Sequence, residues 1–153
     1  WTNLIPRKLW YESVEEASDL MEDQIEVDIQ GYDIDGDVVK AARQNAADAG
    51  VDHLIHFQQR PVSQLRHPKK YGFIITNPPY GERLEEREAL PELYRTFGES
   101  FRRLEDWSAY MITSYDEAER YFGRKADKNR KIYNGMIKTY FYQFMGPKPP
   151  RRQ

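Results

Sequence analysis

The sequence contains no cysteine and only three histidines among its 153 residues. The lack of cysteine excludes disulfides, thiolate zinc sites and cysteine nucleophiles. His53, His56 and His67 have no carboxylate motif beside them, so we expect no metal site. No apolar run approaches the length that crosses a membrane, and the chain carries no signal-like segment. We therefore expect a soluble cytoplasmic protein without a membrane partner.

A strong charge of one sign is also missing, because the net charge is −2 although 31% of the residues are charged. The domain as a whole is therefore not a polyanion-binding surface, and any nucleic-acid contact must come from local patches. Three basic runs, at 66–70, 124–131 and 148–152, are compatible with phosphate contacts or with ordinary solvated faces.

The pattern of apolar residues predicts helices and strands in alternation. An amphipathic helix over 7–25 should pack on the rest of the domain. Asp35 or Asp37 can cap a second helix that ends at Gly50. Further helices are expected at 90–104 and 115–123, and strands at 25–32, 53–59, 71–76 and 107–114.

The end of the chain has a different character. Asn134-Gly135, between two β-rich runs, is a strong signal for a tight hairpin turn. The unbroken apolar centre of 71–76 favours a parallel strand buried on both faces. The sequence thus predicts an α/β, Rossmann-like domain over 1–146, mostly parallel with an antiparallel C-terminal hairpin, and a basic proline-rich tail over 147–153.

Two strand ends carry distinctive chemistry. In open α/β sheets, ligands bind beyond the carboxyl ends of the strands. Asp33 ends the strand "IQGYD", where a carboxylate can accept both hydroxyls of a ribose or serve as an ordinary turn residue.

The motif Asn77-Pro78-Pro79-Tyr80 follows the strand at 71–76. The Asn77 side-chain oxygen and the Pro78 carbonyl offer two acceptors to an exocyclic amino group. The Pro78-Pro79 pair keeps both acceptors fixed, and Tyr80 offers a face on which a base turned out of its stack can lie. We therefore predict that these four residues are catalytic.

The string "NPPYGERL", together with "GYDID…A…NA…AGV" and "KAD…YNG", resembles the bacterial 23S rRNA guanine-N2 methyltransferase family. Its members have often been labelled N6-adenine-specific DNA methylases. The resemblance covers nearly the whole chain and implies a class I fold that uses S-adenosyl-L-methionine (AdoMet). It also implies a seven-stranded sheet with a reversed last strand.

The resemblance assigns a role to each matching position. Asp33 is similar to the ribose-binding acid, and Ile34 to the apolar residue beside the cofactor's adenine. Asn77 resembles the residue that orients the target amino group and lies beside the cofactor. Tyr80 resembles the stacking platform, and Arg83 is a candidate for contacting substrate phosphate.

Two departures from the family pattern affect the cofactor. The acid that normally follows the third strand is replaced by Pro61, so Gln59 or a backbone carbonyl would have to take its place. The first strand and its glycine-rich turn, of the type D-P-x-C-G-S-G-T, do not occur in these 153 residues. We expect the chain to be the C-terminal part of a longer enzyme that also has an RNA-capturing domain, and to bind AdoMet poorly by itself.

Three functions remain open from the sequence. Methyl transfer to guanine N2 in large-subunit rRNA is the first choice, with nucleic acid as partner and rRNA favoured over DNA. N6-adenine DNA methylation is the alternative, since the NPPY motif alone does not distinguish the two. A catalytically silent nucleic-acid-binding fragment is the third.

Overall fold

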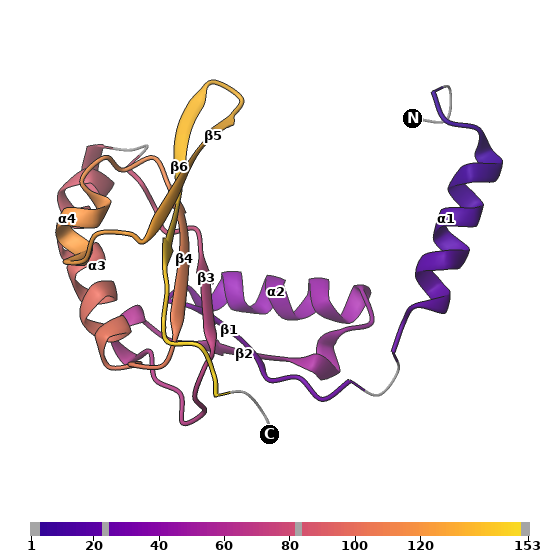
Figure 1. Cartoon of the computed structure of the whole chain (residues 1–153), viewed down its shortest axis with the longest axis horizontal. Coiled ribbons are helices and arrows are strands. Elements are labelled where there is room, and N and C mark those ends of the chain that lie inside the picture. The colour runs from indigo at the N-terminus through magenta and orange to yellow at the C-terminus, as the bar shows by residue number, and fades with distance from the viewer. Residues whose placement is uncertain (1–3, 23–24, 82–83, 151–153) are drawn as a thin grey trace.

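The computed structural model of the chain describes residues 4–22, 25–81 and 84–150. Helices and strands alternate along it, with two short 3-10 turns, η1 (Asp52–Leu54) and η2 (Val62–Gln64) (Figure 1). The helices are α1 (Arg7–Asp19), α2 (Gly36–Asp48), α3 (Leu84–Arg102) and α4 (Ala118–Phe122). The strands are β1 (Ile29–Asp33), β2 (Ile55–Gln59), β3 (Phe73–Thr76), β4 (Ser108–Thr113), β5 (Lys128–Asn134) and β6 (Ile137–Phe144).

The strands form two separate sheets. One holds β1 and β2 in parallel, and the other has the order β3-β4-β6-β5. In the second sheet β3 and β4 are parallel, whereas β6 runs antiparallel to both of its neighbours. The predicted α/β fold, mostly parallel with one reversed strand and a C-terminal hairpin, is therefore confirmed. Within the described residues β1 and β3 do not pair.

Local sequence signals place two of the predicted turns correctly. Asp35 caps α2, and its side chain accepts bonds from the backbone N–H groups of Asp37 and Val38. Gly135 forms the hairpin turn at φ +61°, a left-handed conformation that favours glycine.

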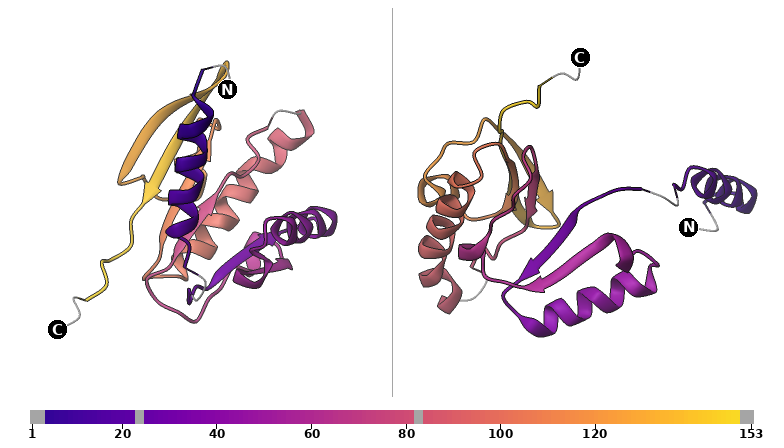
Figure 2. Two further views of the ribbon diagram at one scale, coloured as in Figure 1. Left: turned by 90° about the vertical axis from the view of Figure 1, so that its right-hand side faces the viewer. Right: turned by 90° about the horizontal axis from the view of Figure 1, so that it is seen from below.

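The main core lies between α3 and α4 on one side and the four-stranded sheet on the other (Figures 1 and 2). The two helices approach closely at Gly98, where a Cβ would lie 2.0 Å from the Phe122 carbonyl oxygen. The core consists of the buried residues Leu90, Tyr94, Phe97, Phe101, Ala109, Met111, Ala118, Phe122, Tyr142 and Phe144.

The prediction that 71–76 is buried on both faces is wrong. Side chains of Phe73 and Ile75 are 65% and 83% exposed, whereas Ile74 packs against the core. The reason is that α3 and α4 cover only one face of the four-stranded sheet, and β3 lies at its edge. An apolar run therefore continues on a face that no described element covers.

The prediction that the first helix packs on the domain is also wrong. Helix α1 forms over Arg7–Asp19, but none of its residues is buried, and Leu9, Trp10 and Val14 are exposed. Figure 1 shows α1 standing apart from the two sheets. Its apolar side therefore has no partner in the described part of the chain. None of the described helices is both long and apolar enough to cross a membrane.

Candidate active site

The candidate residues lie at the carboxyl ends of strands in the two sheets. Asp33 and Gln59 end β1 and β2 and are register partners, so the parallel pairing brings them side by side. Asn77 directly follows β3, in the other sheet. Of the predicted cofactor residues, the structure thus brings Asp33, Ile34 and Gln59 into one cluster. Asn77, also predicted to lie beside the cofactor, follows β3 with the rest of the predicted base-binding motif.

The cofactor cluster is fixed by hydrogen bonds between the two strand ends. One carboxylate oxygen of Asp33 accepts from the Asp35 backbone N–H at 2.8 Å, and the Asp33 carbonyl accepts from the Arg60 N–H at 2.8 Å. The second carboxylate oxygen of Asp33 bonds to no described residue. Beside it, the Ile34 side chain is 71% exposed and offers an apolar surface.

The Gln59 side chain is fixed within this cluster. Pro61 has no side-chain atom that can accept a hydrogen bond. The Gln59 amide nitrogen donates to the Ile34 carbonyl at 2.9 Å. This bond orients the Gln59 side-chain oxygen as an available acceptor, near the first residue of α2, Gly36. A residue able to accept from an amino group is therefore present where the acid of the family pattern is replaced.

The motif after β3 forms a turn that α3 holds at two carbonyls. The Tyr94 hydroxyl lies 3.2 Å from the Pro79 carbonyl, and Arg87 Nε donates to the Gly81 carbonyl at 2.9 Å. Gly81 has φ +79°, and a Cβ there would lie 2.6 Å from Arg87 Cγ and 3.0 Å from Leu90 Cδ1. Both the backbone conformation and the space require glycine at this position.

Tyr94 and Thr113 form a buried chain of hydrogen bonds behind the turn. The two hydroxyl oxygens are 2.6 Å apart, and the Tyr115 N–H donates to Thr113 Oγ1 at 3.1 Å. Because a carbonyl oxygen only accepts hydrogen bonds, the Tyr94 hydroxyl donates its one proton to the Pro79 carbonyl. The Tyr94 oxygen therefore accepts a hydrogen bond from the Thr113 hydroxyl. Burial, followed by neighbouring tyrosines that include Tyr115 and Tyr80, raises the pKa of Tyr94 to about 12, so Tyr94 remains a donor at neutral pH.

This anchoring leaves the reactive end of the motif accessible. Asn77 and Pro79 are exposed, and Pro78 and Tyr80 are half-buried. No described residue bonds to the Asn77 side chain, so its amide is accessible. Arg83, the candidate phosphate contact, lies outside the described residues. Across the described residues, no three His, Cys, Asp or Glu side chains gather in a way that could hold a metal ion.

The sequence is similar to proteins that act in methyl transfer. The family described as RMKL-like, methyltransferase domain, matches residues 1–143. The chain belongs to this family. The resemblance to rRNA methyltransferases expected from the sequence is thereby confirmed, and so is the methyltransferase class of the domain.

Individual proteins similar to this chain are also named as methyltransferases. The Bacillus subtilis protein named "Putative RNA methyltransferase YpsC" is 39% identical over 149 residues, which are 97% of this chain and 39% of that protein. "Ribosomal RNA large subunit methyltransferase K/L" of Shewanella baltica (strain OS185) is 37% identical over 139 residues, 88% of this chain and 20% of that protein. The chain thus spans well under half the length of these relatives.

A solved structure matches the fold of the same family. The protein SMU.472, described as "a putative methyltransferase complexed with SAH", superposes with a TM-score of 0.86 at 38% identity. The match covers 95% of this chain and 39% of that one. The mixed sheet with its reversed strand is therefore a methyltransferase sheet of this family.

Sequence reasoning missed Tyr94 and Thr113 as residues that position the site. Tyr94 is part of the apolar stripe of α3 and was expected only in a helix packed on the core. The one available signal was its hydroxyl, because a tyrosine buried among leucines and phenylalanines needs a hydrogen-bond partner.

Proposed function

We propose that the full-length protein transfers a methyl group from AdoMet to an exocyclic amino nitrogen of a nucleic-acid base. Guanine N2 in large-subunit rRNA is the first choice, so the enzyme would take part in rRNA processing in the cytoplasm. The observation that carries this proposal is the Asn77–Tyr80 turn, held from behind by Tyr94 while the Asn77 amide stays exposed. The rRNA methyltransferase named among the relatives supports the choice of substrate.

The cofactor cluster fits the chemical groups of AdoMet. Asp33 has a carboxylate oxygen free for ribose hydroxyls, Gln59 has a side-chain oxygen for an adenine amino group, and Ile34 offers an apolar surface for the ring. The cofactor would supply a methyl group on a sulfonium. The chain's own residues hold it in place and direct the acceptor towards it.

Asn77 and Pro78 would act on the acceptor. An amino nitrogen conjugated with a purine ring is a poor nucleophile. The Asn77 side-chain oxygen and the Pro78 carbonyl would each accept a hydrogen bond from one N–H of the amino group. These two bonds would direct the lone pair of the amino nitrogen towards the methyl group, so that catalysis rests on positioning and electrostatics. The nitrogen would gain the methyl group and release one proton to solvent, the neutral thioether of the cofactor would be left behind, and Tyr80 would stack on the base throughout.

The open edges of β1 and β3 bear on the domain organisation. We place residues 1–146 in a partial catalytic domain, followed by a basic tail over 147–153. A further parallel strand from outside these residues would pair with both edges. That segment, and an RNA-capturing domain beyond it, would complete the enzyme.

Replacement of the Asn77 amide tests the proposed chemistry. In the full-length protein, Asn77→Ala should abolish methyl transfer and leave AdoMet affinity nearly unchanged. Asn45→Ala, at an exposed position on α2, is the matched control and should keep full activity. Activity of Asn77→Ala within a few-fold of the wild type would show that the assignment is wrong.

The substrate is tested separately by supplying AdoMet with a labelled methyl group. Label should enter 23S rRNA lacking its natural modifications, on guanine N2. Label that enters genomic DNA at adenine N6 instead would replace the first choice with DNA methylation. RNA binding without any label transfer would favour a silent binding protein.

A further inference from the structure

The β5–β6 hairpin carries a concentration of positive charge that the proposed chemistry does not use. The hairpin, residues 128–144, has four of the 23 basic residues and none of the 25 acidic ones, and the tail that follows it adds three more basic residues. The remainder of the protein is therefore clearly acidic, although the chain as a whole is near neutral. A local basic surface of this kind is the pattern expected for contacts with phosphates.

The hairpin extends beyond the rest of the sheet. Strand β4 pairs with β6 only over Tyr140–Phe144, so residues 137–139 and 132–134 pair with each other alone. Figure 1 shows this two-stranded extension projecting past the end of β4. Since Thr113 is the carboxyl end of β4, the hairpin projects from the same edge of the sheet as the Asn77–Tyr80 turn.

Four side chains on one face of the hairpin alternate between lysine and tyrosine. Lys131 is opposite Tyr140, and Tyr133 is opposite Lys138, so that all four point to one side. The Lys131 ammonium lies 5.2 Å from the Tyr133 ring centre, and the Lys138 ammonium lies 5.1 Å from that of Tyr140. We call these four residues the lysine–tyrosine patch.

The patch is exposed at its outer end. Tyr133 is 63% exposed, both lysines are exposed, and Tyr140 is half-buried at the inner end. The charge of Asp116 reaches Lys138, but the hairpin itself has no acidic residue. Aromatic faces next to ammonium groups suit bases and phosphates of a single strand, because bases paired in a duplex are not available for stacking.

The patch is connected to the candidate site by direct contacts. Tyr140 is the register partner of Thr113, on the same face of the sheet. Thr113 bonds to Tyr94, and Tyr94 in turn bonds to the Pro79 carbonyl of the turn. A strand of nucleic acid with one base at Tyr80 would therefore have its flanking nucleotides near the hairpin.

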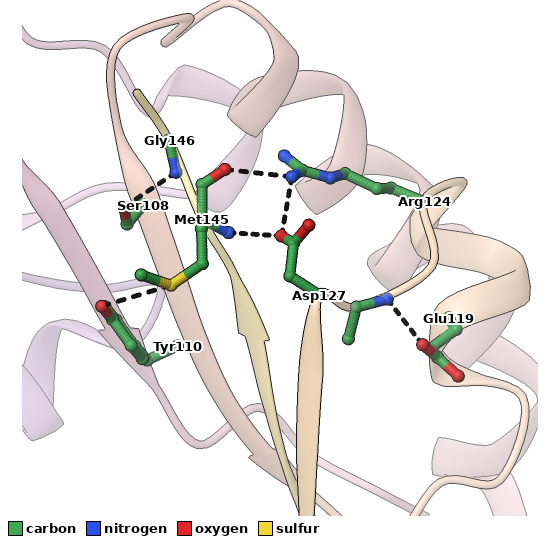
Figure 3. A network of polar contacts seen from close by, with 8 residues as sticks. Ser108, Tyr110, Glu119, Arg124, Asp127, Met145 and Gly146 are labelled. Atoms are coloured by element: carbon green, nitrogen blue, oxygen red, sulfur yellow. Dashed lines mark hydrogen bonds and ion pairs between the residues drawn. The ribbon is translucent and has the colours of Figure 1, made fainter. Parts of the chain in front are cut away.

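The base of the hairpin is held rigidly (Figure 3). Arg124 donates to both the Asp127 carboxylate, at 2.8 Å, and the Met145 carbonyl, at 3.0 Å. The Met145 N–H donates to the same carboxylate at 2.7 Å, and the Gly146 N–H donates to Ser108 Oγ at 2.9 Å. These bonds join the two strands where the hairpin begins and ends, so its projection is fixed relative to β4.

We propose that the lysine–tyrosine patch holds a single-stranded segment of RNA beside the base that enters the active site. Tyr133 would stack on a flanking base, and Lys131 and Lys138 would contact phosphates. The choice of RNA over single-stranded DNA rests on the proposed function.

The test measures RNA binding and methyl transfer in the full-length protein. Binding of a labelled, unstructured RNA of about twelve nucleotides is followed by fluorescence anisotropy over a range of salt concentrations. Tyr133→Ala should raise the Kd and the KM for RNA about tenfold, with kcat and AdoMet affinity unchanged. Tyr133→Phe keeps the ring and should bind like the wild type.

The lysines are tested by charge. Lys131→Gln with Lys138→Gln should reduce the slope of log K against log salt by about 1.4, the change expected for two phosphate contacts on a single strand. Lys8→Gln with Lys40→Gln makes the same change in net charge at exposed positions of α1 and α2, and should leave the slope unchanged.

Three outcomes would overturn the proposal: unchanged RNA binding in the patch variants, equal loss in the control pair, or equal loss of binding to a duplex of the same length. Binding needs no catalysis, so its result is independent of the proposed reaction. A protein that transfers no methyl group would refute the proposed function. Variants that bind RNA normally would refute the role of the hairpin.

Discussion

Removal of one buried hydroxyl at Tyr94 should affect both the stability of the domain and the reaction. In Tyr94→Phe the ring remains in the core, where the residue is 1% exposed, and only the oxygen is lost. The Pro79 carbonyl then loses its tether to α3, and the Thr113 hydroxyl loses its acceptor.

The expected loss of stability follows from the burial of Thr113. The Thr113 side chain is fully buried, so an unpaired O–H there cannot form a hydrogen bond with solvent water. Leaving a buried polar group without a partner costs about 1–3 kcal/mol. We therefore expect Tyr94→Phe to lower the free energy of unfolding by about 2 kcal/mol. The kcat should fall as well, because the turn that carries Asn77 is less restrained, whereas AdoMet affinity should not change.

Urea unfolding followed by circular dichroism measures the first effect, and steady-state kinetics of the full-length protein measures the second. Tyr115→Phe is the matched control, because the Tyr115 ring lies beside that of Tyr94, with ring centres 5.1 Å apart, and its hydroxyl bonds to no described residue. This control should change stability by less than about 0.5 kcal/mol. The double change Tyr94→Phe with Thr113→Val should cost less than the sum of the two single changes, since the unpaired hydroxyl of each is removed. Wild-type stability and kcat in Tyr94→Phe would refute the anchoring role.

Three further predictions concern the turn, alkaline pH and the cofactor. Gly81→Ala should destabilise the domain by more than about 1 kcal/mol and reduce activity. Gly50→Ala should cost less stability, because Gly50 shares the positive φ but has nothing within 4 Å of the added Cβ. Equal losses of stability in urea unfolding would contradict the steric argument. Burial raises the pKa of Tyr94 and that of Tyr142 to about 12, above the usual value of 10.0, so both stay protonated in the folded state after they ionise in the unfolded one. The contribution of these two tyrosines to stability should be constant below pH 10 and fall between pH 10 and 12. Replacing both by Phe should remove most of this alkaline dependence in urea unfolding. Asp33→Asn in the full-length protein should weaken AdoMet binding about tenfold in calorimetry while the fold is retained, and unchanged affinity would exclude Asp33 as the ribose ligand.

The features that were predictable from the sequence are those with local signals. Asp35 satisfies the free N–H groups at the start of α2, and Asn134-Gly135 specifies a tight turn, each within a few residues. The strand ends at Asp33 and Asn77 also have a local signal, because in each case a run suited to a strand is followed by residues that end it. What these signals specify does not depend on distant parts of the chain.

The features that could not be predicted depend on partners far away in the sequence. Ile75 has the composition of a buried strand residue, but its exposure is decided by which face α3 and α4 cover. The role of Tyr94 depends on Thr113, nineteen positions later, and on a proline carbonyl fifteen positions earlier. The apolar residues of α1 likewise predict an amphipathic helix, but they do not specify which surface the helix packs against.

The division between the two sheets has a consequence for ligand affinity. Asp33 ends a strand of one sheet and Asn77 follows a strand of the other, and the two sheets share no strand in the described part of the chain. A ligand that contacts both residues must therefore restrain the two sheets relative to each other. The loss of conformational entropy in this step reduces the net binding free energy of the ligand. A strand paired with the edges of both β1 and β3 would preorganise the site before the ligand binds. Cofactor affinity is in this sense a property of sheet continuity. A substitution at the edge of β1 or β3 would alter it without touching the ligand.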